Sequence, residues 1–335
     1  MDKYRLIIFG NDWDVYQVAY KELIDNPRFT YIPSFRPKGM LGQLQRIQFN
    51  PKLNSIVSIP FKHIWNSYLL RNIKGDNLCF FIQENWLKME CGIKLLSYLR
   101  HYYPTSKIVC FTQDIIETIK DHYSHRPLDV EYMKRYADLF ISYDKADAEK
   151  HQVLYHPTFY SLMKQAPTNQ YVYDLFFLGR DKGRLHLLVT LCKEAQKRGL
   201  TCKFLFIEVP KEEQVPYPGI TYLEHQLPYK ENLLLCSQSK CIVELLQQKA
   251  SSPTFRTWET IALNRKLLSN NTSLIHSDIY DKRYISTFHN IEDIDWDFIT
   301  TPLPFTGSRN PYEEKMRPEG MIQFIEDNLK IKIDR

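Results

Sequence analysis

Glycines and cationic side chains gather in one short segment, where they could bind an anion. Residues 173–184 read YDLFFLGRDKGR, in which an apolar run is followed by Gly179, Gly183, Arg180, Lys182 and Arg184. Glycines let backbone N–H groups approach an anion, a following helix N-terminus adds partial positive charge, and Arg or Lys adds full charge. The segment therefore predicts a diphosphate site. The alternative is a solvent-exposed turn that uses glycine only for its φ angle.

A second candidate region lies at residues 239–271, after another apolar run. Glu244 ends the run, and a helix expected from about residue 255 follows Thr254 and carries Arg256 and Glu259. A glutamate at a strand's carboxyl end could accept the hydroxyls of a ribose or hexose, while Thr254, Arg256 and the helix amides suit phosphate. The alternative is a capped helix with an i,i+3 ion pair and no further role.

Four carboxylates in the first half each follow an apolar run: Asp12, Asp14, Glu84 and Asp114. At the carboxyl end of a strand, such a group could take the proton from an attacking hydroxyl. The alternatives are helix N-caps for Asp12 and Asp114, and a first-turn partner of the helix dipole for Asp14.

Asp12 and Asp14 also form a DxD pair, whose two carboxylates could bind a divalent metal. The histidine pairs at 122 and 125 and at 151 and 156 lack an HExxH arrangement or a cysteine partner. We therefore expect no metal site and no cofactor.

Short apolar runs alternate with helical patterns along the chain, which predicts an α/β fold. Strands are expected at 4–9, 78–82, 107–111, 139–142, 172–178, 202–207, 220–223, 240–244 and 266–269, with helical patterns at 61–72, 87–100, 184–198, 230–238 and 255–264. The pattern loosens around 151–170. We expect two doubly wound, mainly parallel domains, at 1–165 and 166–310, with a helical tail at 311–335 that packs on the first.

Composition narrows the function classes. The net charge is +5, from 44 basic and 39 acidic residues, which does not indicate nucleic-acid binding but allows contact with anionic lipid headgroups. Seven cysteines without a CxxC pair indicate a reducing compartment. The apolar run at the N-terminus is too short for a signal peptide, so we expect a cytoplasmic protein.

Together, FFLGRDKGR, Tyr229 with Glu231, SKCIVEL and TFRTWETIALNRKLLSNN resemble the donor-binding domain of bacterial GT-B glycosyltransferases, in particular those of capsule, exopolysaccharide and lipopolysaccharide biosynthesis. The resemblance covers the second half of the chain. It implies that the second domain binds a nucleotide diphosphate sugar, most often a UDP-sugar, and that the first binds a glycan or lipid-linked glycan, at the inner membrane. Arg180, Lys182 and Arg256 would then face the diphosphate, and Glu259 the ribose or sugar, without a metal.

One position departs from the family. Many retaining GT-B enzymes carry two glutamates separated by seven residues, and if Glu259 is the second, Ser251 stands at the first. The sequence therefore leaves open whether transfer inverts or retains the anomeric centre. It also leaves a second function open, that of a non-catalytic partner subunit that binds a nucleotide or sugar.

Overall fold

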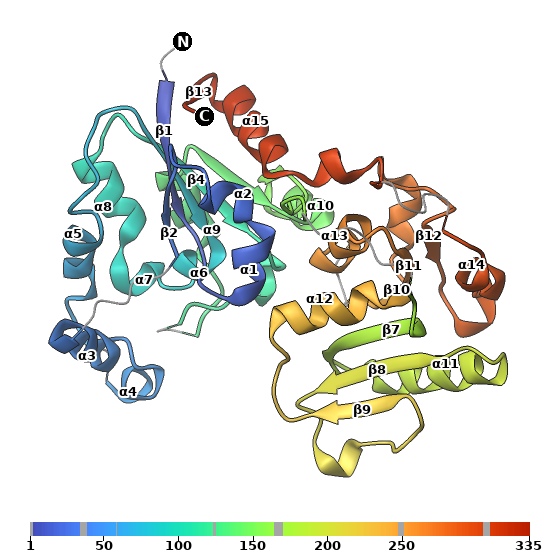
Figure 1. The fold of residues 1–335 in the computed structure, drawn as a ribbon. Helices are drawn as coiled ribbons and strands as arrows, with labels where there is room; N and C mark the ends of the chain where they lie inside the picture. The colour runs from blue at the N-terminus through green and yellow to red at the C-terminus, as the bar shows by residue number, and fades with distance from the viewer. Residues whose placement is uncertain are drawn as a thin grey trace. The chain divides into compact units, whose positions relative to one another are not determined.

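The protein divides into two compact α/β units in a computed structural model (Figure 1). The structure describes residues 3–33, 39–57, 59–122, 125–163, 170–246, 251–303 and 309–335. Unit 1 comprises Met1–Thr158 and Pro318–Arg335, and unit 2 comprises Phe159–Arg317. The C-terminal helix therefore belongs to the first unit.

Unit 1 is built on a parallel sheet whose strands are continuous apolar runs. In spatial order β13-β1-β3-β4-β5-β6, with β2 beside β1, its strands are β1 (Lys3–Phe9), β2 (Thr30–Ile32), β3 (Leu78–Gln83), β4 (Lys107–Thr112), β5 (Leu139–Ser142), β6 (Leu154–Tyr155) and β13 (Lys332–Ile333). Every residue of β3 is buried, as expected for a strand covered on both faces.

The helices of unit 1 are mostly short: α1 (Asp14–Ala19), α2 (Lys21–Ile24), α3 (Gly39–Gln48), α4 (Pro51–Ile56), α5 (Trp65–Leu69), α6 (Glu84–Leu87), α7 (Glu90–Ile93), α8 (Leu95–Tyr102), α9 (Val130–Tyr136), α10 (Lys145–His151) and α15 (Pro318–Leu329). The prediction of a single helix over 87–100 is wrong, because two helices, α7 and α8, lie there. Lys94 adopts a left-handed backbone (φ +51°), which ends α7, and the Glu90 carboxylate accepts hydrogen bonds from the Leu95 and Leu96 amides at the start of α8.

Unit 2 is a doubly wound sheet. Its strands, in spatial order, are β12 (Ile285–Thr287), β11 (Lys266–Ser269), β10 (Ser239–Glu244), β7 (Tyr173–Arg180), β8 (Cys202–Ile207) and β9 (Ile220–Leu223). Its α-helices are α11 (Leu185–Lys197), α12 (Tyr229–Ser237), α13 (Phe255–Ala262) and α14 (Trp296–Thr300).

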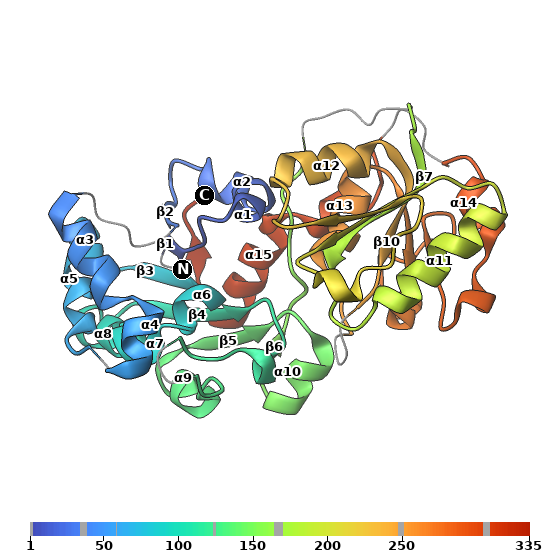
Figure 2. The same cartoon turned by 90° about the horizontal axis from the view of Figure 1, so that it is seen from below.

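Alternation along the strands of unit 2 places its helices on both faces. Leu175 and Phe177 pack in one core cluster with Leu188 of α11, whereas Phe176 packs in another with Cys236 of α12. Figure 2 shows α11 and α12 on opposite sides of the sheet. The predicted α/β class with two parallel-sheet domains is confirmed.

Both sheets reverse their winding once. In unit 1 the order reverses between β1 and β3, and in unit 2 between β7 and β10. In open parallel sheets, ligands bind beyond the carboxyl ends of the strands at this topological switch point. Ligands are therefore expected beside the residues that follow Phe9 and Gln83 in unit 1, and Arg180 and Glu244 in unit 2.

Candidate functional site

The glycine loop after β7 places Arg184 across the switch point of unit 2. The Arg184 guanidinium donates to the backbone oxygens of Leu245, beyond β10, and of Arg180 (3.2 Å). A Cβ atom on Gly179 would lie 2.9 Å from Arg184 Nη2, so glycine leaves room for the guanidinium at this position. Burial and the nearby Arg256 guanidinium lower the pKa of Arg184. A position where two guanidinium groups repel one another favours an anion.

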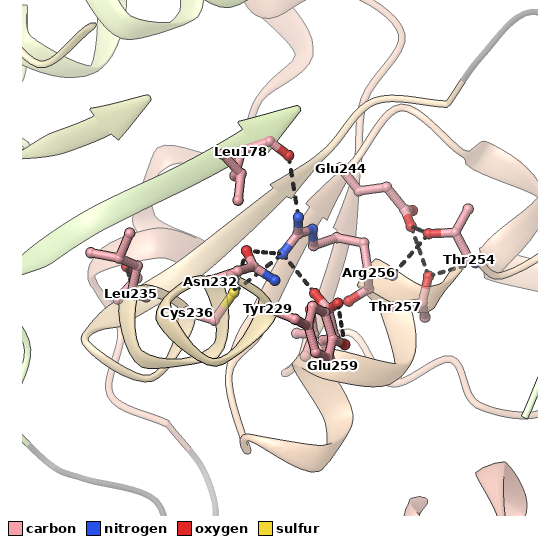
Figure 3. A network of polar contacts seen from close by, with 12 residues as sticks. Leu178, Tyr229, Asn232, Leu235, Cys236, Glu244, Thr254, Arg256, Thr257 and Glu259 are labelled. Atoms are coloured by element: carbon pink, nitrogen blue, oxygen red, sulfur yellow. Dashed lines mark hydrogen bonds and ion pairs between the residues drawn. The ribbon is translucent and has the colours of Figure 1, made fainter. Parts of the chain in front are cut away.

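Arg256 is held at the same place by a dense polar network (Figure 3). Its Nη2 donates to the Leu178 oxygen of β7 (3.2 Å), and its Nη1 pairs with Glu259 Oε2 (2.6 Å) and contacts Asn232 Oδ1 (3.2 Å). Burial alone would lower the pKa of Arg256, but the Glu259 carboxylate outweighs it and the pKa is raised. The guanidinium is a permanently charged group in a fixed orientation.

Glu259 contacts protein groups with both of its oxygens. Tyr229 Oη donates to Glu259 Oε1 at 2.6 Å, and Tyr229 Oη lies 2.9 Å from Tyr160 Oη. Burial, followed by the charge of Glu259, raises the pKa of both tyrosines well above the ordinary value, so the hydroxyls stay protonated donors. The i,i+3 ion pair of the alternative interpretation is therefore present, and Glu259 holds Arg256.

Glu244 anchors the start of α13. Its Oε1 accepts hydrogen bonds from the hydroxyls of Thr254 (2.5 Å) and Thr257 (2.9 Å), and its Oε2 accepts one from Ser269 (2.7 Å). Thr254 is the N-cap of α13 and accepts from the Arg256 amide at 3.0 Å. The carboxylate thus fixes the helix N-terminus at the end of β10, next to Arg256.

The other two cations of the glycine loop are exposed. Arg180 pairs with Glu208 at 3.0 Å, and both side chains are about half exposed. Lys182 and Gly183 adopt left-handed backbone angles of +48° and +79°, which form the turn into α11. The structure therefore brings Gly179, Arg184, Glu244, Thr254, Arg256 and Glu259 together, with Arg180 and Lys182 on the solvent side.

The switch point of unit 1 opens into a cavity of about 740 Å³. Its lining combines aromatic rings with side-chain amides: Trp13, Tyr16, Phe49, Trp65 and Trp86 with Asn11, Gln45, Asn50, Asn66, Gln83, Asn85 and Gln113. Amides donate and accept at once, and rings offer flat apolar faces. This combination suits a polar ligand with many hydroxyls.

Close packing at the end of β1 holds three residues of this lining, Asn11, Asn85 and Trp86. A Cβ atom on Gly10 would lie 2.1 Å from the Tyr31 ring, and the Tyr31 hydroxyl exchanges 3.0 Å hydrogen bonds with the backbone of Asn11. The Gly10 oxygen accepts from Asn85 Nδ2 (2.9 Å) and Trp86 Nε1 (2.8 Å). Because burial raises the pKa of Tyr31 to about 12, its hydroxyl stays protonated.

The predicted carboxylates are divided between the cavity and other places. Asp12 and Glu84 line the cavity. The Glu84 carboxylate accepts a hydrogen bond from the backbone N–H of Gln113 (2.9 Å) and pairs with Lys88. The lining from the described part of the chain includes neither Asp14 nor Asp114.

The helix-cap interpretations of Asp12 and Asp114 are wrong. The N-cap of α1 is Trp13, whose amide donates to Asn11 Oδ1 (3.1 Å), and the short 3-10 helix that follows Asp114 has Ile115 as its N-cap. Asp14 is the first residue of α1, where its charge complements the helix dipole.

Two cavity residues were missed from the sequence. Gln83 is 1% exposed, and neither of its amide atoms has a hydrogen-bond partner among the described residues. Burial, followed by the charge of Lys88, lowers the pKa of His122, so its imidazole is neutral near pH 7 and could accept a proton. Gln83 carries a usable signal, because it is the first polar residue after LCFFI; His122 carries none.

No protein-family model and no curated protein matches the sequence. Solved structures match the chain over nearly its whole length. A UDP-forming trehalose-phosphate synthase from Burkholderia xenovorans is 11% identical with a TM-score of 0.58, covering 98% of this chain and 99% of that one. An alpha-glucosyltransferase in complex with UDP and DNA is 13% identical with a TM-score of 0.59, covering 98% and 100%.

A UDP-GlcNAc 2-epimerase from Methanocaldococcus jannaschii is 11% identical with a TM-score of 0.50, covering 97% of this chain and 100% of that one. At these identities the likeness concerns the fold. The chain has the two-domain α/β fold that GT-B glycosyltransferases share.

The described residues offer neither a metal-binding cluster nor a membrane-spanning helix. They contain no group of three His, Cys, Asp or Glu side chains that could hold a metal ion. Within the same residues, no helix has the length and apolar character needed to cross a bilayer.

Proposed function

We propose that this protein is a metal-independent glycosyltransferase. It would move a hexose from a nucleotide diphosphate sugar, most simply a UDP-sugar, to a hydroxyl of a surface-polysaccharide acceptor, either a glycan or a lipid-linked glycan. The observation that carries the proposal is the convergence of Arg184, Arg256 and the N-terminus of α13 at the switch point of unit 2. The fold is shared with a UDP-forming trehalose-phosphate synthase and with an alpha-glucosyltransferase solved in complex with UDP, which supports a UDP-sugar as donor.

In this proposal the two guanidiniums and the helix N-terminus neutralise the departing diphosphate, which otherwise needs a metal ion. Arg256 contacts the diphosphate, and Glu259 and Tyr229 are positioning residues that act through it, because they fix its guanidinium. Arg180 and Lys182 add charge from the exposed loop. Glu244 acts through Thr254, by fixing the helix start.

The cavity of unit 1 takes the acceptor, and Asp12 and His122 are the candidates for the base that accepts the hydroxyl proton, ahead of Glu84, Asp14 and Asp114. Glu84 ranks lower because Lys88 and the Gln113 amide already hold its oxygens. The protein would act at the cytoplasmic face of the inner membrane, where lipid-linked acceptors are exposed.

The test is titration calorimetry with UDP, followed by a panel of UDP-sugars with oligosaccharide acceptors and detection of released UDP. Arg184→Ala should weaken UDP binding by at least about tenfold, because one charge-assisted contact contributes about 1.5 to 3 kcal/mol. Arg198→Ala, at the exposed residue that follows α11, is the matched control and should bind normally. Activity should survive EDTA. UDP binding that is unchanged in Arg184→Ala, or activity that requires added Mg²⁺, contradicts the proposal.

One observation favours a second candidate, a non-catalytic partner subunit that binds a nucleotide or sugar. Ser251 stands where retaining enzymes have a glutamate, and both oxygens of Glu259 contact protein groups. This candidate predicts UDP binding without release of UDP from any donor. Measurement of turnover over the same panel separates the two functions.

A further inference from the structure

The helices before β3 have their polarity reversed. In α3 the apolar residues Met40, Leu44 and Ile47 follow the i,i+4,i+7 spacing of one helix face, and all three are exposed, Met40 by 77%. Gln45, on the opposite side, is buried. A helix that packs on a core buries its apolar face, so α3 presents to solvent the face that a core helix would hide.

The next two elements repeat this reversal. In α4, Asn54 is buried and its amide donates to the oxygens of Gln48 and Asn50 (2.8 Å each), while Ile56 is 82% exposed. In the 3-10 helix Lys62–Ile64, the Lys62 ammonium is buried and donates to the Ile59 oxygen, whereas Ile64 is exposed.

The exposed apolar side chains of these elements form what we call the apolar face: Met40, Leu41, Leu44, Ile47, Leu53, Ile56, Val57, Phe61 and Ile64. Figures 1 and 2 both draw α3, α4 and α5 together on one side of the unit 1 sheet. Polar side chains that hold the backbone from inside, with apolar ones outside, indicate a surface that is built for an apolar neighbour.

The stretch of sequence that carries this face has charges of one sign only. Residues 26–75 contain no Asp or Glu but eight Lys and Arg: Arg28, Arg36, Lys38, Arg46, Lys52, Lys62, Arg71 and Lys74. The whole chain carries +5, so the remaining residues sum to −3. Exposed apolar side chains among cations are typical of segments that lie in the interface of an anionic bilayer.

We propose that the apolar face docks this protein on an anionic lipid bilayer. The apolar side chains enter the boundary between headgroups and acyl chains, and the exposed Lys52 meets the lipid phosphates. A second copy of the chain is a poorer partner, because a two-fold interface would set each acid-free segment against another of the same charge.

Docking has a consequence for the cavity that rests on the proposed function. The inner side of the same elements supplies Gln45, Phe49 and Trp65 to the cavity lining. The bilayer would therefore lie against the outer side of the elements whose inner side forms the acceptor pocket. A lipid-linked glycan could then reach that pocket while its lipid stays in the membrane.

The test is co-sedimentation with vesicles of phosphatidylcholine alone, or of phosphatidylcholine mixed with phosphatidylglycerol. The protein should bind only the anionic vesicles, and more weakly as salt is raised. The triple variant Met40→Ser, Leu44→Ser, Ile47→Ser should bind on the order of a hundredfold more weakly, since three large apolar side chains no longer enter the bilayer. The control triple Val172→Ser, Leu234→Ser, Ile275→Ser changes equally apolar, exposed residues of unit 2 and should bind normally.

Two readouts separate docking from transfer. Thermal unfolding and transfer to a lipid-free acceptor should be unchanged in the first triple variant. None of its three positions belongs to the described residues that line the cavity. Equal binding to neutral vesicles, normal binding by the triple variant, or sedimentation of the wild type as a dimer that the variant dissolves overturns the docking. If the wild type transfers no sugar to the lipid-free acceptor, only the proposed function is overturned.

Discussion

The two switch points share a topology but differ in how far their polar groups are satisfied. In unit 2, Arg256, Glu259 and Glu244 each have several hydrogen-bond or ion-pair partners. In unit 1, the cavity is lined by Gln83, whose amide has no partner among the described residues, and by Asn85, whose Oδ1 has none either. A satisfied charge network fixes a cation in place, whereas an unsatisfied buried amide costs stability until a ligand pairs with it.

This difference indicates two binding strategies. A rigid guanidinium in unit 2 needs no reorganisation when an anion arrives, which is how preorganised sites stabilise charge. The amides of unit 1 gain their hydrogen bonds only from a ligand, which favours discrimination between ligands that can and cannot pair with them. The difference can be tested by substitutions that remove a satisfied charged group from unit 2 or an unsatisfied amide from unit 1.

The largest effect is expected from Arg256→Ala. Glu259 would remain buried without its ion-pair partner, and breaking such a pair typically costs about 3 to 5 kcal/mol of unfolding free energy. From the sequence, both residues are expected to contact ligand and not the core, so that the variant would fold normally. Urea denaturation, followed by circular dichroism, distinguishes the two expectations.

The control for this prediction is the double variant Arg256→Met, Glu259→Leu. It removes both charges, and replacing a whole buried pair by apolar residues is often neutral. The double variant should therefore be more stable than Arg256→Ala while still failing to bind UDP. If Arg256→Ala retains full stability, the polar network of unit 2 does not hold its charged groups rigidly, and the two switch points do not differ in this way.

An intermediate effect of the opposite sign is expected from Gln83→Leu. Removing a buried amide that has no partner should raise the unfolding free energy by about 1 to 3 kcal/mol. The same change should raise KM for the acceptor while leaving UDP affinity intact, since the amide no longer pairs with a hydroxyl. Thermal unfolding and steady-state kinetics measure the two effects.

Gln113→Leu is the matched control, because the Gln113 amide follows the neighbouring strand and does have a partner, the Thr158 hydroxyl at 3.0 Å. Leucine there leaves that hydroxyl without its donor, so stability should fall. A loss of stability in both variants would mean that Gln83 is already satisfied, and that unit 1 does not differ from unit 2 in this respect.

Local patterns predicted most strands of the fold, because buried parallel strands are continuous apolar runs. Residues 202–207, 220–223 and 266–269 form strands with the predicted bounds. The single helix expected over 87–100 failed because helical periodicity does not reveal a left-handed residue such as Lys94. No helix is predicted at 39–56, although Met40, Leu44 and Ile47 of α3 have helical spacing.

The candidate site was predictable where charge marked it. Arg184, Glu244 and Arg256 stand out by type and position, and the structure brings them together. The contacts of these residues could not be predicted. Tyr229 belongs to the resemblance, but it reaches Glu259 across 30 residues of sequence only because α12 packs on α13. Gln83 was not singled out, and His122 was considered only as a metal ligand, because an amide and a histidine have many ordinary roles.

The smallest effect is expected from Arg180→Ala, which tests whether the exposed loop belongs to the network of unit 2. Arg180 and Glu208 are both about half exposed, so the loss of their pair should change the unfolding free energy by at most about 1 kcal/mol. If Arg180 also faces the diphosphate, UDP affinity should fall by up to about tenfold and the salt dependence of binding should weaken. Lys182→Ala changes the other exposed cation of the same loop and serves as the comparison. Calorimetry at two salt concentrations measures the UDP affinity of both variants. Equal, salt-independent affinities in the wild type and both variants would leave anion binding to Arg184, Arg256 and the start of α13 alone, and would confine the charge of this site to its fixed, buried part.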